Sequence, residues 1–200
     1  MMLELFGQNL AITMAIMFGL WLVSLAIRDV SIVDVFWGFG FVVIASLAFF
    51  ATGEATHRKL LLIILTAAWG LRLTLHLARR KIGTPEDYRY RAMREKIGPR
   101  FWIVSLFLVF VLQGVIMNVV ALPVVAGQWD RSDLNWANIV GIGVWLIGFV
   151  FETVGDWQLT AFQADPGNHG KVMACGLWRY TRHPNYFGDF MIWRSPEWGC

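Results

Sequence analysis

Long stretches without charged side chains limit what this sequence can fold into more than any other feature. Residues 9–27 contain 19 positions without a charge, and at about 1.5 Å per helical residue they can cross roughly 30 Å of hydrocarbon. Apolar stretches of similar length lie at residues 30–52, 60–78, 101–126 and 136–157. A helix pairs its own backbone groups inside lipid, and the chain has no alternating pattern of the β-barrel kind. We therefore predict an all-α integral membrane protein, a polytopic helical bundle with about five complete transmembrane helices.

The composition agrees with a lipid environment and excludes several other classes. Hydrophobic residues make up 57% of the chain and charged residues 16%, whereas soluble domains have about 25% charged residues. The net charge of +3 comes without the interleaved basic and aromatic residues of nucleic-acid binding, so no nucleic-acid partner is expected. Cys175 and Cys200 are far apart and outside any CxxC pair. We expect neither a disulfide framework nor a thiolate metal site.

The basic residues are distributed unevenly between the two sets of loops. The three on one side are Arg58, Lys59 and Arg131; the twelve on the other are Arg28, Arg79, Arg80, Lys81, Arg89, Arg91, Arg94, Lys96, Arg100, Lys171, Arg179 and Arg182. Loops rich in Lys and Arg usually remain in the cytoplasm. The pattern predicts an outside N-terminus and cytoplasmic locations for both long polar segments.

The domain organisation follows from the same pattern. We predict a single transmembrane domain over residues 1–200, with a helical bundle at 1–161 and a cytoplasmic loop leading into the start of a sixth helix at 162–193. Residues 194–200 form an atypical tail, since Pro196 and its polar neighbours cannot complete a span. We expect a truncated or frame-shifted product that could lack activity, with a genuine short variant as the alternative.

The segment at residues 162–189 differs in composition from everything before it. Turn-forming residues cluster at 165–170, and Lys171, Arg179 and Arg182 follow. Arginine forks bind phosphate, and the amides of Asn168 and Asn185 can both donate and accept hydrogen bonds. This combination suits a nucleotide cofactor, and contact with phospholipid head groups explains it equally well.

The sequence GLWRYTRHPNYFGD at residues 176–189 carries a specific resemblance. The whole run 162–189 closely resembles the C-terminal NADPH-binding region of the steroid 5-alpha-reductase family, especially its little-characterised bacterial branch. Upstream, VDVFWG at 33–38, WGLRL at 69–73 and EDYRY at 86–90 are similar to the same branch. The shorter core RHPNYFG at 182–188 is also similar to membrane methyltransferases, so this core alone does not separate hydride transfer from methyl transfer.

The resemblance implies an NADPH-dependent oxidoreductase that acts on a CH–CH group, in the inner membrane of a bacterium. A hydrophobic lipid-like substrate, steroid-like or isoprenoid, would enter from the bilayer and meet NADPH in a cytoplasm-facing cavity. The cofactor contacts that the family implies are Asp165, Asn168, Lys171, Arg179, Tyr180, Arg182, His183, Asn185 and Tyr186. The alternatives are an S-adenosylmethionine-dependent membrane methyltransferase and an inactive truncated membrane protein.

The resembled family also uses a carboxyl group and a tyrosine near the substrate carbonyl. Reduction of an activated double bond needs a donor where negative charge develops on the carbonyl oxygen. The candidate catalytic residues are Asp34, Tyr88 and Tyr90. Asp34 could instead pair with Arg72 across two helices, and of the two roles the residues favour this pairing.

Other polar residues in the apolar stretches have structural interpretations. Glu152 and Asp156 share one helical face and could bind a metal or anchor the cofactor loop at Arg182. No third ligand accompanies them, so we predict no metal site and favour the anchoring role. Gln113 and Asn118 are five positions apart, and we expect each to form an interhelical hydrogen bond.

Overall fold

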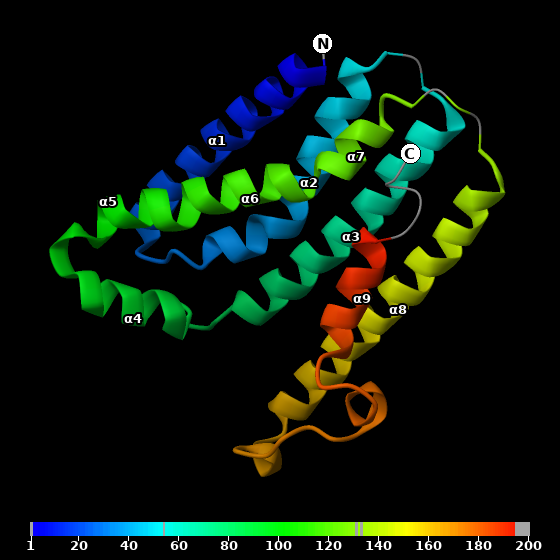
Figure 1. The fold of residues 1–200 in the computed structure, drawn as a ribbon. Coiled ribbons are helices and arrows are strands. Elements are labelled where there is room, and N and C mark those ends of the chain that lie inside the picture. The colour runs from blue at the N-terminus through cyan, green and yellow to red at the C-terminus, as the bar shows by residue number, and fades with distance from the viewer. Residues whose placement is uncertain (1, 54, 131, 133, 195–200) are drawn as a thin grey trace. The chain divides into compact units, whose positions relative to one another are not determined.

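The computed structural model describes residues 2–53, 55–130, 132 and 134–194, and within these ranges it contains helices, turns and bends but no strand. Figure 1 shows the order of the helices along the chain. The α-helices are α1 (Met2–Ile27), α2 (Ile32–Ala51), α3 (His57–Lys81), α4 (Tyr88–Ile97), α5 (Phe101–Ser105), α6 (Leu112–Val120), α7 (Leu122–Gly127), α8 (Trp136–Ala164) and α9 (Pro184–Trp193). Three 3₁₀ turns, η1 (Gly98–Arg100), η3 (Pro166–Asn168) and η4 (Gly176–Arg179), and one π-helical segment, η2 (Leu106–Val111), complete the described structure. The predicted all-α class is confirmed.

Five helices are long and apolar enough to cross a membrane: Leu3–Ile27, Ile32–Ala51, His57–Lys81, Tyr88–Val120 and Trp136–Ala164. They confirm the predicted five spans and a multi-pass membrane protein. The fourth contains a turn at Gly98–Arg100, where Gly98 adopts a φ of 68° that favours glycine. It ends at Val120, earlier than the predicted residue 126, because Ala121 and Pro123 interrupt the helix before α7.

The chain divides into two compact units, Met1–Asp133 and Leu134–Cys200. In the first, α2 and α3 pack most closely because Gly38 and Gly70 face each other. A Cβ added to either glycine would collide with the carbonyl oxygen of the other. Phe41 and Trp69 continue this contact with ring centroids 5.3 Å apart. The backbones can approach here only because neither position carries a side chain.

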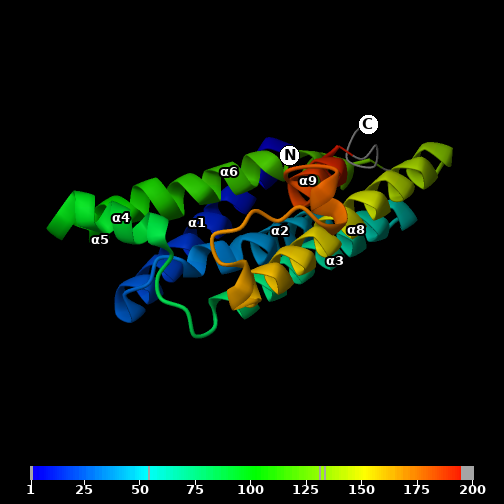
Figure 2. The same cartoon turned by 90° about the horizontal axis from the view of Figure 1, so that it is seen from below.

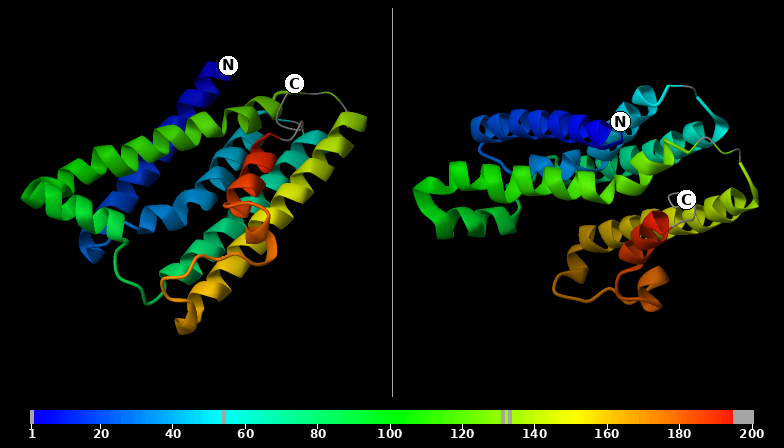
Figure 3. Two further views of the ribbon diagram at one scale, coloured as in Figure 1. Left: turned by 60° about the horizontal axis from the view of Figure 1, so that its bottom comes forward. Right: turned by 45° about the horizontal axis from the view of Figure 1, so that its top comes forward.

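Helix α1 packs on the path that runs from α5 through η2 to α6 in the first unit (Figure 3). The Trp21 indole donates a 2.9 Å hydrogen bond to the Trp102 carbonyl, and the two rings stack with centroids 6.3 Å apart. Met17 and Met117 are fully buried, whereas Phe18 and Phe107 expose about half of their surface. The buried side chains form the core and the exposed ones suit contact with lipid.

Arg58 and Lys59 lie inside α3, although the sequence placed them in a loop before the third span. Both are buried, at 6% and 1% exposed. Arg58 Nη1 lies 2.8 Å from Asp130 Oδ2, and Lys59 Nζ donates a 3.2 Å hydrogen bond to the Thr52 carbonyl. The prediction was wrong because it began the third span only after these two charges. Inside the unit both charges have partners, so the helix can begin before them.

In the second unit α9 lies against α8 (Figure 2). The contact depends on Gly148 in α8 and Gly188 in α9, since a Cβ on Gly188 would collide with the backbone nitrogen of Glu152. Helix α9 is 10 residues long, shorter than each of the five candidate spans. The predicted atypical tail lies almost wholly outside the described residues.

Candidate functional site

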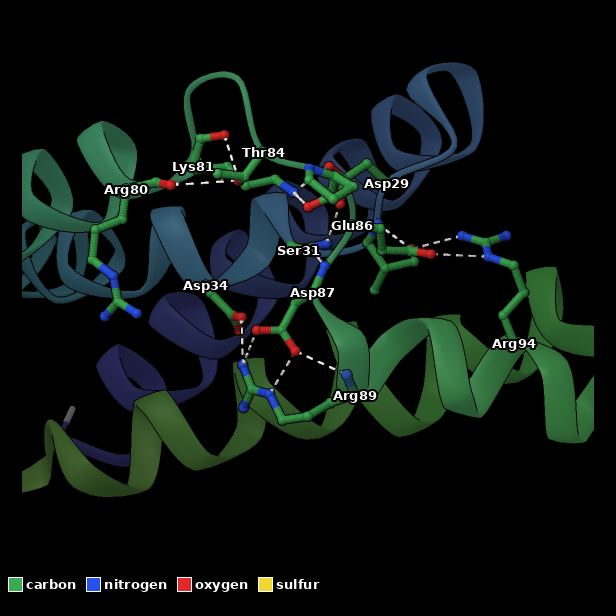
Figure 4. A network of polar contacts seen from close by, with 12 residues as sticks. Asp29, Ser31, Asp34, Arg80, Lys81, Thr84, Glu86, Asp87, Arg89 and Arg94 are labelled. Atoms are coloured by element: carbon green, nitrogen blue, oxygen red, sulfur yellow. Dashed lines mark hydrogen bonds and ion pairs between the residues drawn. The ribbon is translucent and has the colours of Figure 1, made fainter. Parts of the chain in front are cut away.

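In the first unit, hydrogen bonds join the α1–α2 connection to the α3–α4 connection, and the two connections together position the start of α4 (Figure 4). In the α1–α2 connection, the Val30 N–H donates to Glu86 Oε1 at 2.9 Å. In the reverse direction, the Asp87 N–H donates to the Ser31 hydroxyl at 2.8 Å. Glu86 is also held by the Arg94 guanidinium at 2.7 Å. These bonds place α4 beside the first turn of α2.

Two carboxylates at this junction are stabilised in the charged form. Asp87 caps α4, and hydrogen bonds from the Arg89 side chain and backbone hold the pKa of Asp87 below its ordinary value of 3.8. Burial would raise the pKa of Asp29, but hydrogen bonds from Lys81, at 2.6 Å, and Ser31 outweigh burial and lower it. Both groups hold the connections in place as anions.

A half-buried polar cluster lies behind this junction, between α2, α4 and α6. The Tyr90 hydroxyl, in a residue only 6% exposed, donates a 2.7 Å hydrogen bond to Asp34 Oδ1. The Gln113 amide donates to the Tyr90 hydroxyl oxygen at 3.2 Å. Arg89 Nη2 lies 3.0 Å from the second carboxylate oxygen, Asp34 Oδ2. The cluster is a proton donor and acceptor pair, with an amide that orients the donor.

The cluster separates the two candidate tyrosines. Tyr88, at the first position of α4, is 72% exposed, whereas Tyr90 is buried against Asp34. Asp34 takes its partners from α4, so its predicted pairing with Arg72 is wrong. The cause is the α1–α2 connection, which brings α4 rather than the middle of α3 to the start of α2.

An open pocket of about 390 Å³ lies at the surface of this junction. We call it the basic pocket, because four of its lining residues are Arg80, Lys81, Arg89 and Arg91. Asp34 also lines it, so the carboxyl group that bonds Tyr90 is accessible from outside. A ligand in the basic pocket can therefore contact Asp34 directly, whereas Tyr90 does not line the pocket and lies behind Asp34.

The predicted cofactor loop belongs to the second unit, where one face of α8 anchors it. The Leu177 N–H donates to Gln158 Oε1 at 3.0 Å, and the Trp178 indole donates to the Gly155 carbonyl at 3.1 Å. Asn185 Nδ2 donates to Asp156 Oδ1, also at 3.1 Å. Asp156 therefore anchors the segment as expected, but through Asn185 and not through Arg182.

Asp165 and Asn168 shape the turn at the end of α8. Asp165 Oδ1 accepts a 2.8 Å hydrogen bond from the Gly167 N–H, and Asn168 Nδ2 donates to the Phe162 carbonyl at 3.1 Å. Both residues line a pocket of about 290 Å³ together with Lys171. The turn thus presents a cation and an amide around a small cavity.

The other predicted cofactor residues lie on the surface of the second unit. The exposed ones are Arg179, Tyr180, Arg182, His183 and Tyr186. The His183 ring lies close to the rings of Trp178 and Tyr186, with centroids 6.3 Å and 5.2 Å away. Asn185 differs from them because its Oδ1 atom is buried and accepts no hydrogen bond. An acceptor of this kind suits an N–H donor from a ligand.

Three contributors were not assigned to the sites from the sequence: Gln113, Arg89 and Gln158. Gln113 does form the predicted interhelical bond, but its partner is a candidate catalytic residue. The matching expectation for Asn118 is wrong, since its amide bonds the Gly114 carbonyl of its own helix. A glutamine inside an apolar span was the available signal for Gln113.

These features define a multi-pass helical membrane protein with a half-buried carboxylate–phenol–amide cluster and a cation-bearing polar loop. The chain belongs to the family described as protein of unknown function (DUF1295), whose model matches residues 20–197. This family is distinct from the steroid 5-alpha-reductase-like proteins, although it is related to them.

One curated relative is an uncharacterized protein of Schizosaccharomyces pombe, 28% identical over 209 residues. The match covers 88% of this chain and 59% of that protein, so the chain spans about three fifths of its relative. No solved structure matches.

Proposed function

We propose that the protein is an NADPH-dependent membrane reductase of an activated carbon–carbon double bond in a hydrophobic substrate, steroid-like or isoprenoid. The observation that carries this proposal is the hydrogen bond between Tyr90 and Asp34, at 2.7 Å. It joins two of the three residues expected to act as the acid at a substrate carbonyl. The relation of the family to steroid 5-alpha-reductase-like proteins supports the same reaction class.

The cluster has the groups that such a reaction needs. As hydride reaches the carbon distant from the carbonyl, negative charge develops on the carbonyl oxygen, and a nearby donor lowers the barrier. Asp34 lines the basic pocket, so in its protonated form it would donate to that oxygen. Tyr90, held by Gln113, would stabilise the resulting Asp34 carboxylate through its hydrogen bond. Water would then protonate the second carbon, and the carbonyl oxygen would return its proton to Asp34 as the ketone forms, so that the net proton comes from solvent.

The second unit has groups that fit the cofactor. Lys171, Arg179 and Arg182 are exposed cations suited to the phosphates, and the unpaired Oδ1 of Asn185 is suited to a carboxamide N–H. When bound, NADPH would supply the hydride. Three cations are a poor match for the cationic, phosphate-free S-adenosylmethionine, which makes methyl transfer the weaker alternative.

The orientation belongs to the same proposal: an outside N-terminus and a cytoplasmic loop, in the bacterial inner membrane. Its support is the excess of basic residues in one set of connections and in the helix ends next to them. Cys175 is exposed in the loop. In a Cys200→Ser background, a membrane-impermeant maleimide should label it in inverted vesicles and leave it unlabelled in intact cells; the reverse result contradicts the orientation.

The direct experiment is an NADPH titration of the detergent-purified protein, followed by energy transfer from its 11 tryptophans to the reduced nicotinamide. Saturable binding that S-adenosylmethionine does not displace supports the reductase and justifies a screen of enones. Displacement by S-adenosylmethionine favours the methyltransferase. Absence of binding by folded protein favours the inactive alternative and rejects the reductase.

A further inference from the structure

Two arginines of the basic pocket are free of ion pairs within the part of the chain that the structure describes: Arg80 near the end of α3 and Arg91 in α4. The other charged side chains of the pocket are paired, as Lys81 with Asp29, Arg89 with Asp34 and Asp87, and Glu86 with Arg94. In Figure 4 the Arg80 guanidinium extends away from these pairs. Because Arg89 faces two carboxylates, these side chains together carry a net charge of +1, and the guanidinium groups of Arg80 and Arg91 are the ones left to bind an anion.

The pocket lies where spans meet their boundaries. The third candidate span ends at Lys81, the second begins at Ile32, and the fourth begins at Tyr88, and side chains from all three line the pocket. Val35 and Leu77 add apolar surface to the polar wall. A ligand bound here can keep an apolar chain in lipid and a polar head in water.

The side chains indicate the chemistry of that head. Guanidinium groups bind phosphate oxygens through paired hydrogen bonds, and two of them match a doubly charged phosphate monoester. A volume of about 390 Å³ is within the range of small-molecule sites. We infer that the basic pocket binds the phosphate head group of an amphiphile whose apolar chain stays in the bilayer.

This inference deepens the proposed function and rests on it in one respect, the identity of the substrate. Asp34 lines the same pocket, so the bound amphiphile lies beside the carboxyl group proposed to act on the substrate. The substrate of the reductase is then a phosphate-bearing amphiphile and not a neutral sterol. Binding itself is measurable without turnover.

The test compares two double variants of the full chain in detergent. Arg80→Gln with Arg91→Gln removes the free arginines, and Arg79→Gln with Lys96→Gln is the matched control, because those exposed residues lie on the same two helices outside the pocket lining. The probes are dioctanoyl phosphatidic acid, dioctanoylglycerol and inorganic phosphate, titrated calorimetrically. Unchanged thermal midpoints show that the variants are folded.

We expect phosphatidic acid to bind the native protein and the control alike, and the pocket variant at least about tenfold more weakly. Equal affinity in both variants overturns the assignment of the head group to Arg80 and Arg91. If dioctanoylglycerol binds the native protein as tightly as phosphatidic acid does, the phosphate is not recognised. If inorganic phosphate binds as tightly as phosphatidic acid does, the apolar chains of the amphiphile are not recognised. Either result overturns the inference.

NADPH titration of the same preparations separates this inference from the proposed function. Protein that binds NADPH but not phosphatidic acid contradicts the head-group site alone. Protein that binds phosphatidic acid but not NADPH contradicts the reductase and leaves an amphiphile-binding site. Binding of both, with only the amphiphile lost in the pocket variant, supports the two together.

Discussion

The hydroxyl of Tyr90 donates a 2.7 Å hydrogen bond to the carboxylate of Asp34, which lies 56 positions earlier in the chain. The bond joins α4 to the first turn of α2 and depends on the junction in which Ser31 accepts from Asp87. This hydrogen bond therefore holds α4 against α2 and also joins the two residues proposed to act in catalysis.

Tyr90→Phe should destabilise the protein by about 1.5–3 kcal/mol, because Asp34 loses its donor inside the unit. It should also lower NADPH-dependent enone reduction by at least about a hundredfold. Thermal unfolding in detergent and NADPH oxidation measure the two effects. Tyr88→Phe is the control, since Tyr88 is 72% exposed, and an equal effect of both changes contradicts the role of Tyr90.

Arg182→Ala should weaken NADPH binding by about tenfold while NADH binding changes less. The exposed Arg182 guanidinium would contact the 2′-phosphate that only NADPH carries. Tryptophan energy transfer measures both affinities. Arg100→Ala, an exposed arginine of the first unit, should change neither, and equal losses for NADPH and NADH in Arg182→Ala argue against a 2′-phosphate contact.

Gly188→Ala should destabilise the second unit by about 1–3 kcal/mol, because the new methyl group would overlap the carbonyl oxygen of Gly148. Gly143→Ala is the matched control in α8. A Cβ at Gly143 meets no heavy atom within 4 Å, and alanine favours the helix by about 0.5–1 kcal/mol. Opposite shifts of the thermal midpoint are expected; shifts of the same size and sign would reject the close α8–α9 contact.

Arg58→Ala should cost about 1–3 kcal/mol of stability, because Asp130 loses its 2.8 Å partner and a buried space opens. Arg79→Ala, at the exposed far end of the same helix, should change stability by at most about 0.5 kcal/mol. Thermal unfolding compares the two variants. Equal midpoints would show that Arg58 is not part of the buried structure.

Acid should weaken the junction between the α1–α2 connection and the α3–α4 connection. Asp29 and Asp87 have folded-state pKa values below their ordinary value of 3.8. Their contribution to stability is therefore complete above the unfolded-state pKa and is lost as the pH falls through the lower folded-state pKa. Stability should decline below about pH 4, and the decline should be shallower in Asp29→Asn with Asp87→Asn. An unchanged slope in that double variant would contradict the stabilising role.

Much of the architecture could be predicted from local pattern. Length and hydropathy decide whether a segment can span lipid, so the five spans were predictable, as was the polar run that follows the fifth. The ends of the helices were harder to predict. Arg58 and Lys59 resemble loop residues, yet they lie inside α3 because Asp130 and the Thr52 carbonyl satisfy them.

Composition and periodicity along single segments were enough to predict the class of protein, the number of spans and a short set of candidate residues, since none of these depends on packing between segments. The tertiary structure alone distinguished Tyr90 from Tyr88. Residues two apart on a helix point to different sides, and the junction that places α4 beside α2 determines which side is buried. It also gave Asp34 a partner in α4 in place of Arg72, because a contact across 56 positions is set by packing and leaves no local pattern.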